Sequence, residues 1–117
     1  MKKKVKVTHI IAEFYGCDAK LLERTNSVKD MLEESVRVSK LTKIRSHFHQ
    51  FSPHGVTGFI LLKESHVSIH TWPEYNYAAI DLFGCGDRSQ ILAAYDVLIK
   101  KLNPSNVKKK EVRRGLR

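Results

Sequence analysis

Most of the side chains that could do chemistry lie between residues 63 and 87. This stretch holds a Glu-Ser step, two histidines on one alternation, the only tryptophan and a cysteine between glycines, at Glu64, Ser65, His66, His70, Trp72 and Cys85. A hydroxyl or thiol is a potential nucleophile, and a nearby imidazole is the usual base that activates it. Cys85 with His70 is therefore a candidate for thiol chemistry, although a small buried cysteine is the simpler interpretation on composition alone.

The spacing of the same residues argues against two common kinds of site. His66 and His70 are four residues apart, which spreads them over about 13 Å on a strand, too far for one metal ion. The HExxH pattern is absent, and Ser65 does not lie in a GxSxG elbow. We therefore predict neither a metal site nor a serine hydrolase triad.

Three motifs carry a resemblance to a known family. They are SPHGVTG at residues 52–58, ESHVSIHTWPEYNYAAID at residues 64–81 and FGCGD at residues 83–87. In these motifs the chain resembles the prokaryotic S-adenosylmethionine decarboxylases, pyruvoyl-dependent enzymes that are made as a proenzyme. The resemblance implies self-cleavage between Glu64 and Ser65. The products would be a beta chain of residues 1–64 and an alpha chain of residues 65–117, which begins with a pyruvoyl group made from Ser65.

The resemblance also implies roles for single side chains. His70 corresponds to the histidine that supports processing, and Thr57 stands where the family usually has a serine that assists it. Cys85 corresponds to the proton donor that completes turnover, a role that suits a thiol. Phe51 corresponds to an aromatic residue that stacks on adenine, and Glu74 to a carboxylate that holds the ribose hydroxyls.

The implied activity is decarboxylation of S-adenosylmethionine for polyamine (spermidine) synthesis. The pyruvoyl group would form a Schiff base with the substrate amine and withdraw electrons, without a metal. The nearest alternative is a pyruvoyl-dependent arginine decarboxylase of the same family, because the self-processing motif does not distinguish the two substrates. The presence of Phe51 and Glu74 favours S-adenosylmethionine, which contains a nucleoside, over arginine.

A basic nucleic-acid-binding module is the alternative from another class, because the net charge is +9. The basic residues cluster near the two ends without aromatic residues that could stack on bases. These residues are Lys2, Lys3, Lys4, Lys6, Lys108, Lys109, Lys110, Arg113, Arg114 and Arg117. Protection of edge strands from aggregation explains them better, so we predict no nucleic-acid partner.

Hydrophobic periodicity predicts the elements that must position these residues. Period-two alternation or a short apolar run favours strands at residues 4–14, 42–51, 56–63, 65–72 and 77–83, and a short edge strand within 106–117. The strand at 56–63 looks buried on both sides. Helical spacing covers residues 26–41, with Asn26 or Ser27 as the N-cap, and residues 88–102, with Asp87 as the N-cap.

This order of elements predicts one α+β domain spanning residues 1–117, a two-layer sandwich with an antiparallel sheet and two helices on one face. The uncovered face suits a homodimer, and the resemblance implies active sites where two protomers meet. No apolar run reaches the length of about 20 residues that a bilayer span needs. We expect a cytoplasmic protein with no membrane partner and with Cys17 and Cys85 reduced.

One geometric point concerns Ser65 and His70, which are an odd number of residues apart. In an unbroken strand their side chains would point to opposite sheet faces. We therefore predict that regular backbone geometry breaks near Glu64 and Ser65, where strain would assist cleavage.

Overall fold

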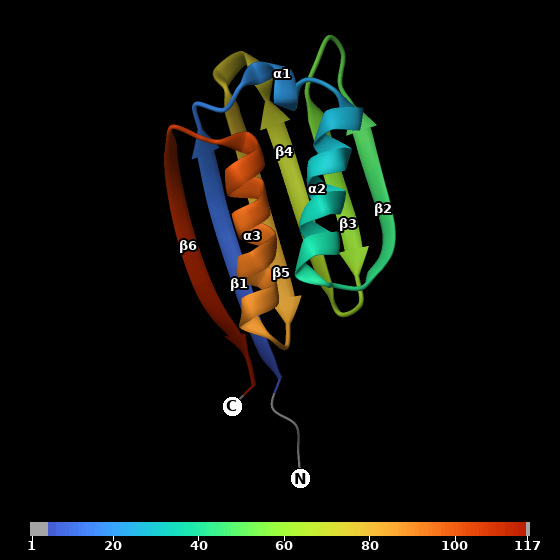
Figure 1. The fold of residues 1–117 in the computed structure, drawn as a ribbon, viewed down its shortest axis with the longest axis vertical. Coiled ribbons are helices and arrows are strands. Elements are labelled where there is room, and N and C mark those ends of the chain that lie inside the picture. Colours follow the sequence, from blue (N-terminus) through green and yellow to red (C-terminus); the bar gives the residue numbers. More distant parts are fainter. Residues whose placement is uncertain (1–4, 117) are drawn as a thin grey trace.

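A computed structural model describes residues 5–116, in which one open sheet carries helices on a single face (Figure 1). The strands are β1 (Lys6–Tyr15), β2 (Lys43–Gln50), β3 (Val56–Leu62), β4 (Ser65–Trp72), β5 (Tyr77–Cys85) and β6 (Asn106–Gly115). The helices are α1 (Ala19–Leu22), α2 (Thr25–Ser39), the 3-10 helix η1 (Pro73–Tyr75) and α3 (Arg88–Leu102). The strand order is β2-β3-β4-β5-β1-β6, and every neighbouring pair is antiparallel. The predicted α+β architecture is confirmed.

The core lies between the sheet and the two long helices, α2 and α3. Successive strand side chains point to opposite faces, so alternate residues of each central strand pack under the helices. Fully buried members include Ile10, Phe14, Leu32, Ile69, Leu82 and Leu98. Burial of these apolar side chains is the main favourable contribution to the free energy of folding.

The opposite sheet face has no helix over it in the described part of the chain, and we call it the open face. Its large apolar side chains stay partly in solvent: Phe59 is 40% exposed and Leu61 41%. The prediction that β3 is buried on both sides is therefore wrong for the single chain. The helices cover only the alternate residues, such as Ile60 and Leu62.

The two long helices begin in different ways. Asp87 caps α3 as predicted, because its side chain accepts a 2.9 Å hydrogen bond from the Ser89 N–H. The prediction that Asn26 or Ser27 caps α2 is wrong. This helix begins at Thr25, and its first N–H donates instead to Oε1 of Gln50, 2.8 Å away at the end of β2.

The beginning of β1 and the end of β6 lie at the same end of the sheet (Figure 1). The last strand, β6, is longer than the short edge strand predicted, because it pairs with the whole of β1, from Lys6 opposite Gly115 to Tyr15 opposite Asn106. Of the basic residues named in the terminal clusters, four lie outside the described residues: Lys2, Lys3, Lys4 and Arg117. Within residues 5–116, no helix is long and apolar enough to cross a membrane.

Candidate active site

The Glu64–Ser65 bond lies at the tight turn that joins β3 to β4. The turn has only two residues, Lys63 and Glu64, because Leu62 pairs directly with Ser65. Glu64 has a φ of 66°, in the left-handed region that side chains with a Cβ rarely adopt. The predicted break is thus confirmed at Glu64 only, and such a conformation costs on the order of 1–3 kcal/mol. At Ser65 the prediction is wrong, because β4 is regular from Ser65 to Trp72 and Ser65 and His70 stay on opposite faces.

Cys85 contacts both sides of that bond. Its backbone N–H donates to Oγ of Ser65 at 3.0 Å, and its thiol donates to the carbonyl oxygen of Glu64, also at 3.0 Å. Pairing of His66 with Phe83 brings the end of β5 beside the beginning of β4 and so makes these contacts. Gly84, next to Cys85, lets α3 pack closely on the end of β5, because a Cβ there would collide with the side chain of Ile91.

The two cysteines lie in different environments. Cys85 is partly exposed, whereas Cys17 is 1% exposed. Burial raises the pKa of the Cys17 thiol to about 11, so that it remains protonated and unreactive near neutral pH. Of the two, only Cys85 is placed to take part in chemistry at the surface.

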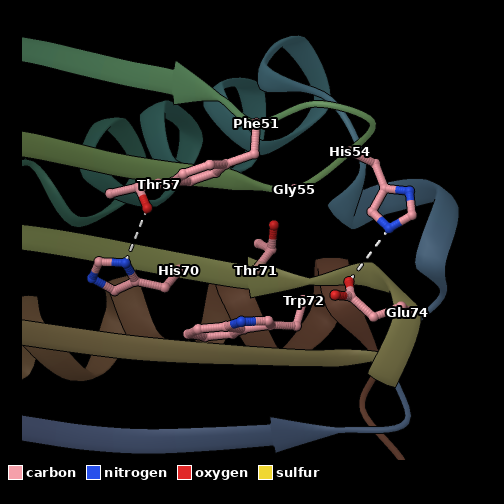
Figure 2. A pocket seen from close by; sticks show the side chains of 8 residues that line it. All are labelled: Phe51, His54, Gly55, Thr57, His70, Thr71, Trp72 and Glu74. Carbon is pink, nitrogen blue, oxygen red and sulfur yellow. Dashed lines mark hydrogen bonds and ion pairs between the residues drawn. The ribbon is translucent and has the colours of Figure 1, made fainter.

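A second group of polar residues surrounds a cavity of about 400 Å³ at the other end of β4 (Figure 2). Thr57 and His70 face each other across the β3–β4 pairing, and Oγ1 of Thr57 is hydrogen-bonded to Nδ1 of His70 at 3.1 Å. The cavity is lined by Phe51, His54, Gly55, Thr57, His70, Thr71, Trp72 and Glu74.

Aromatic side chains and a carboxylate give this cavity its chemical character. Phe51 and Trp72 lie on opposite sides of the hollow, and they are 47% and 40% exposed (Figure 2). Glu74 lies at the edge, where its Oε1 is 3.4 Å from Nε2 of His54. Such a site can stack a flat ring, accept hydrogen bonds from hydroxyls and attract a cation.

Sequence reasoning did not assign a binding role to two of the lining residues, His54 and Trp72. Both belong to recognised motifs, SPHG and IHTWPE, but no property of an isolated histidine or tryptophan showed that they face the same space. Their common location depends on the register of β3 with β4 and on the loop before β3. That register is a tertiary feature.

The two groups do not meet within one chain. Ser65 and His70 are five residues apart on β4, which corresponds to about 16 Å. Their side chains also lie on opposite faces, since Ser65 is 7% exposed beside the buried Val67 and His70 is exposed on the open face. The structure therefore brings together Glu64, Ser65 and Cys85, and separately Phe51, Thr57, His70 and Glu74.

No metal centre emerges from the part of the chain that the structure describes. Among residues 5–116, no group of three or more His, Cys, Asp or Glu side chains is placed to hold a metal ion. His9 and His66 do approach the same carboxylate, Asp81, on the open face. That arrangement has two imidazoles against one acid, which is an ordinary set of polar contacts.

The chain matches one known family over nearly its whole length. The family model described as S-adenosylmethionine decarboxylase matches residues 8–115. The S-adenosylmethionine decarboxylase proenzyme of Hydrogenobaculum sp. (strain Y04AAS1) is 52% identical over 108 residues, which are 92% of this chain and 81% of that relative. The proenzyme of Archaeoglobus fulgidus is 45% identical over 107 residues, 92% of this chain and 96% of that one.

A solved structure agrees with the sequence comparison. The crystal structure of the adenosylmethionine decarboxylase from Aquifex aeolicus VF5 superimposes with a TM-score of 0.94 at 43% sequence identity, covering 98% of this chain and 95% of that one. The resemblance seen in the three motifs is thus confirmed by both comparisons. The chain belongs to the S-adenosylmethionine decarboxylase family and is a carboxy-lyase by that membership.

Proposed function

We propose that the chain cuts itself between Glu64 and Ser65 and then decarboxylates S-adenosylmethionine with a pyruvoyl group formed from Ser65. One observation carries this proposal, the placement of the Cys85 thiol 3.0 Å from the Glu64 carbonyl oxygen. The names of the relatives, which are proenzymes, support it. The decarboxylated product would supply aminopropyl groups for polyamine synthesis.

The cleavage begins with the hydroxyl of Ser65. Its oxygen attacks the carbonyl carbon of Glu64, and the peptide C–N bond breaks, so that an ester and a free amine result. Removal of the α-proton of residue 65 then expels the Glu64 carboxylate and leaves a carbon–carbon double bond at residue 65. Water finally replaces the nitrogen, which leaves as ammonia, and the chain 65–117 begins with pyruvoyl.

Cys85 is suited to assist the first step. Negative charge develops on the Glu64 carbonyl oxygen during the attack, and a donor already aimed at that oxygen stabilises it without reorganisation. The thiol is such a donor, and the left-handed φ of Glu64 raises the energy of the uncut chain. Both effects lower the barrier to cleavage of this bond relative to others in the chain.

The surroundings of Ser65 also fit the group that it would become. Once formed, a pyruvoyl group supplies an electron-withdrawing carbonyl that accepts the electron pair released by decarboxylation. Ser65 is only 7% exposed, and the Cys85 N–H donates to its oxygen. The Cys85 thiol lies within the same group of residues, where it can return a proton to the substrate carbon.

The cavity near His70 is the proposed site for the substrate. Phe51 and Trp72 offer aromatic faces to the adenine ring and the sulfonium cation, and Glu74 can accept hydrogen bonds from the ribose hydroxyls. Arginine has neither an adenine ring nor a ribose, so these features favour S-adenosylmethionine over the arginine alternative.

Because the two groups of residues are separated in one chain, we propose that the active enzyme is a homodimer. A second copy placed against the open face would bring its own Thr57–His70 pair toward the Glu64–Ser65 bond from the side of Cys85, which shares that face with Phe83. The partner's His70 would then act as the base for the α-proton. The partly exposed apolar side chains of that face, Ile11, Phe59, Leu61 and Trp72, support such an interface.

A cytoplasmic location is part of the same proposal. Cys17 and Cys85 are both free thiols in the structure. Reduced cysteines are typical of the cytoplasm.

A carbonyl reagent tests the proposed cofactor. Phenylhydrazine condenses with ketones and releases water, so it is expected to inactivate the protein and to add its mass, less one water, to the chain 65–117 alone. The matched control is Ser65→Ala, which cannot form the ketone and should remain unlabelled. Labelling of the chain 1–64, or full activity after complete labelling, would contradict the proposal.

A further inference from the structure

The loop that carries Phe51 and His54 is fastened to the helical layer mainly by one side chain, Gln50. Its Oε1 accepts from the Thr25 N–H at 2.8 Å. The two N–H groups of its Nε2 are shared among three backbone carbonyls, that of Glu23 at 2.8 Å and those of Phe51 and Gly55, each at 3.1 Å. One amide therefore joins the beginning of α2 to both ends of the loop.

The orientation of this amide is fixed by its partners. Exchange of Oε1 and Nε2 would place an oxygen against three carbonyl oxygens and a donor against the Thr25 N–H, with every contact repulsive. Gln50 also satisfies the first N–H of α2, a helix whose N-cap residue, Arg24, makes no side-chain cap hydrogen bond. The side chain thus has two separable tasks, which are to cap α2 through its oxygen and to hold the loop through its nitrogen.

The loop itself has few other constraints. The Phe51 N–H donates to the Gly55 carbonyl at 2.8 Å, which closes residues 51–55 on themselves, and the Gly55 N–H donates to the Glu23 carbonyl at 3.1 Å. Phe51 is 47% exposed, so packing in the core does not fix its ring. The position of Phe51 at the cavity therefore depends on where these hydrogen bonds hold its backbone.

On these contacts, we propose that Gln50 is a positioning residue for substrate binding, because its side-chain nitrogen sets the place of Phe51 and His54 at the cavity. The proposal rests on the proposed role of that cavity as the substrate site. Self-cleavage should depend little on Gln50. The Thr57–His70 pair is held by the β3–β4 pairing and by its own hydrogen bond, whereas the contacts of Gln50 hold only the loop at residues 51–55.

Two substitutions separate the tasks of Gln50. Gln50→Glu keeps the acceptor for Thr25 but loses the donors and turns a carboxylate toward the three carbonyls. Gln50→Arg loses the acceptor but keeps a donor, because Nε of arginine is the same number of bonds from the backbone as Nε2 of glutamine. Gln50→Met removes both the acceptor and the donors without adding a charge. It replaces Gln50→Glu in the test if the glutamate variant does not fold.

For the self-processed enzyme, we expect Gln50→Glu and Gln50→Met to raise KM for S-adenosylmethionine about tenfold and to change kcat less than about threefold. Gln50→Arg should keep KM within about threefold of the parent, although its melting temperature falls. All three should cut themselves as the parent does. An unchanged KM in Gln50→Glu and Gln50→Met would overturn the proposal. A KM that rises in every variant in step with the fall in melting temperature would also overturn it, because the effect would then be a general loss of stability.

A binding measurement distinguishes this proposal from the proposed function on which it rests. Trp72 is the only tryptophan and lines the cavity, so its fluorescence reports occupancy without any turnover. In a Ser65→Ala background, S-adenosylmethionine should quench it, with a Kd about tenfold weaker when Gln50→Met is added. If S-adenosylmethionine binds Ser65→Ala equally well with and without Gln50→Met, the role of Gln50 is wrong but the substrate site stands. No quenching in the Ser65→Ala parent would overturn the substrate site together with it.

Discussion

At the scale of single residues, Cys85 connects the making of the proposed cofactor with its use. The thiol donates to the Glu64 carbonyl oxygen, and the N–H of the same residue donates to the Ser65 hydroxyl. A thiol is a weak hydrogen-bond donor, but it can also give up its proton. The same side chain therefore suits both charge stabilisation in cleavage and proton return in turnover.

Alkylation of the enzyme with iodoacetamide at pH 8 should modify Cys85 and spare Cys17. Cys85 is partly exposed, whereas burial raises the pKa of Cys17 to about 11 and leaves little thiolate there. Activity should fall at least about 100-fold, because the proton donor is blocked. Peptide mapping and turnover of S-adenosylmethionine measure the two effects, and added substrate should slow both.

The control for that experiment is Cys17→Ala, which should still lose its activity on alkylation. If Cys17 is modified first, the assignment of environments to the two thiols is wrong. If complete modification of Cys85 leaves the activity intact, Cys85 is not the proton donor.

At the scale of elements, two junctions build the site around Ser65. The β3–β4 turn places the Glu64–Ser65 bond, and the end of β5 places Cys85 just before α3 begins. Gly86 has a φ of 94°, which lets the chain turn from β5 into the helix. The Asp87 cap then fixes where that helix starts, so it also limits where Cys85 can lie.

Asp87→Ala should lower the melting temperature at pH 7 by about 2–5 °C, because the first turn of α3 loses its cap. Hydrogen bonds from the Ser89 hydroxyl and N–H hold the pKa of Asp87 below its ordinary value. With the pKa lowered in the folded state, the stabilisation is complete above the unfolded pKa of about 3.9 and is lost as the pH falls through the folded value. Thermal melts of both proteins from pH 7 to pH 3 measure the difference, which should shrink in acid.

Asp87→Asn is the matched comparison, since asparagine keeps the acceptor oxygen and has no carboxylate to titrate. Its melting temperature should stay near that of the parent at pH 7. A difference between the parent and Asp87→Ala that is the same at pH 7 and pH 3 would contradict the role of the ionised cap.

Local pattern predicted the strands and long helices well, because alternation and helical spacing record which side chains face a core. It failed where the deciding partner is distant in sequence. The start of α2 depends on Gln50, which is 25 residues away from Thr25. The exposure of Phe59 and Leu61 depends on which sheet face the helices cover. Motif similarity proposed Ser65, His70 and Cys85 as site residues, but only the pairing of strands showed that His70 lies far from the other two.

At the scale of the whole molecule, the uncovered sheet face and the divided site lead to the same proposal. One chain holds a cleavable bond without the Thr57–His70 pair near it, and a cavity without Ser65 in it. A homodimer with composite sites resolves both features at once. It also covers the apolar side chains that one chain leaves partly exposed.

Co-expression of two inactive variants tests the composite site. Ser65→Ala and His70→Ala should each remain uncut when expressed alone. When they are expressed together, the His70→Ala chain should be cut, because it keeps Ser65 and can receive the partner's His70. Mass spectrometry of the mixed protein measures the fragments, and only those of the His70→Ala chain are expected.

The same experiment has clear contrary outcomes. Efficient cleavage of His70→Ala by itself would show that His70 is not needed for processing. No cleavage in the mixture, in a sample where size exclusion shows mixed dimers, would show that the two copies do not complement each other.

The central claim is that the Glu64–Ser65 bond breaks itself and leaves pyruvoyl on the second chain. Intact-mass measurement of the purified protein tests it most directly, with Ser65→Ala as the control. We predict two chains, Met1 to Glu64 and 65 to Arg117, the second lighter by one ammonia than a chain that begins with serine, and a single uncut chain for Ser65→Ala. One uncut chain in the parent, or a second chain that still begins with serine, would contradict the account.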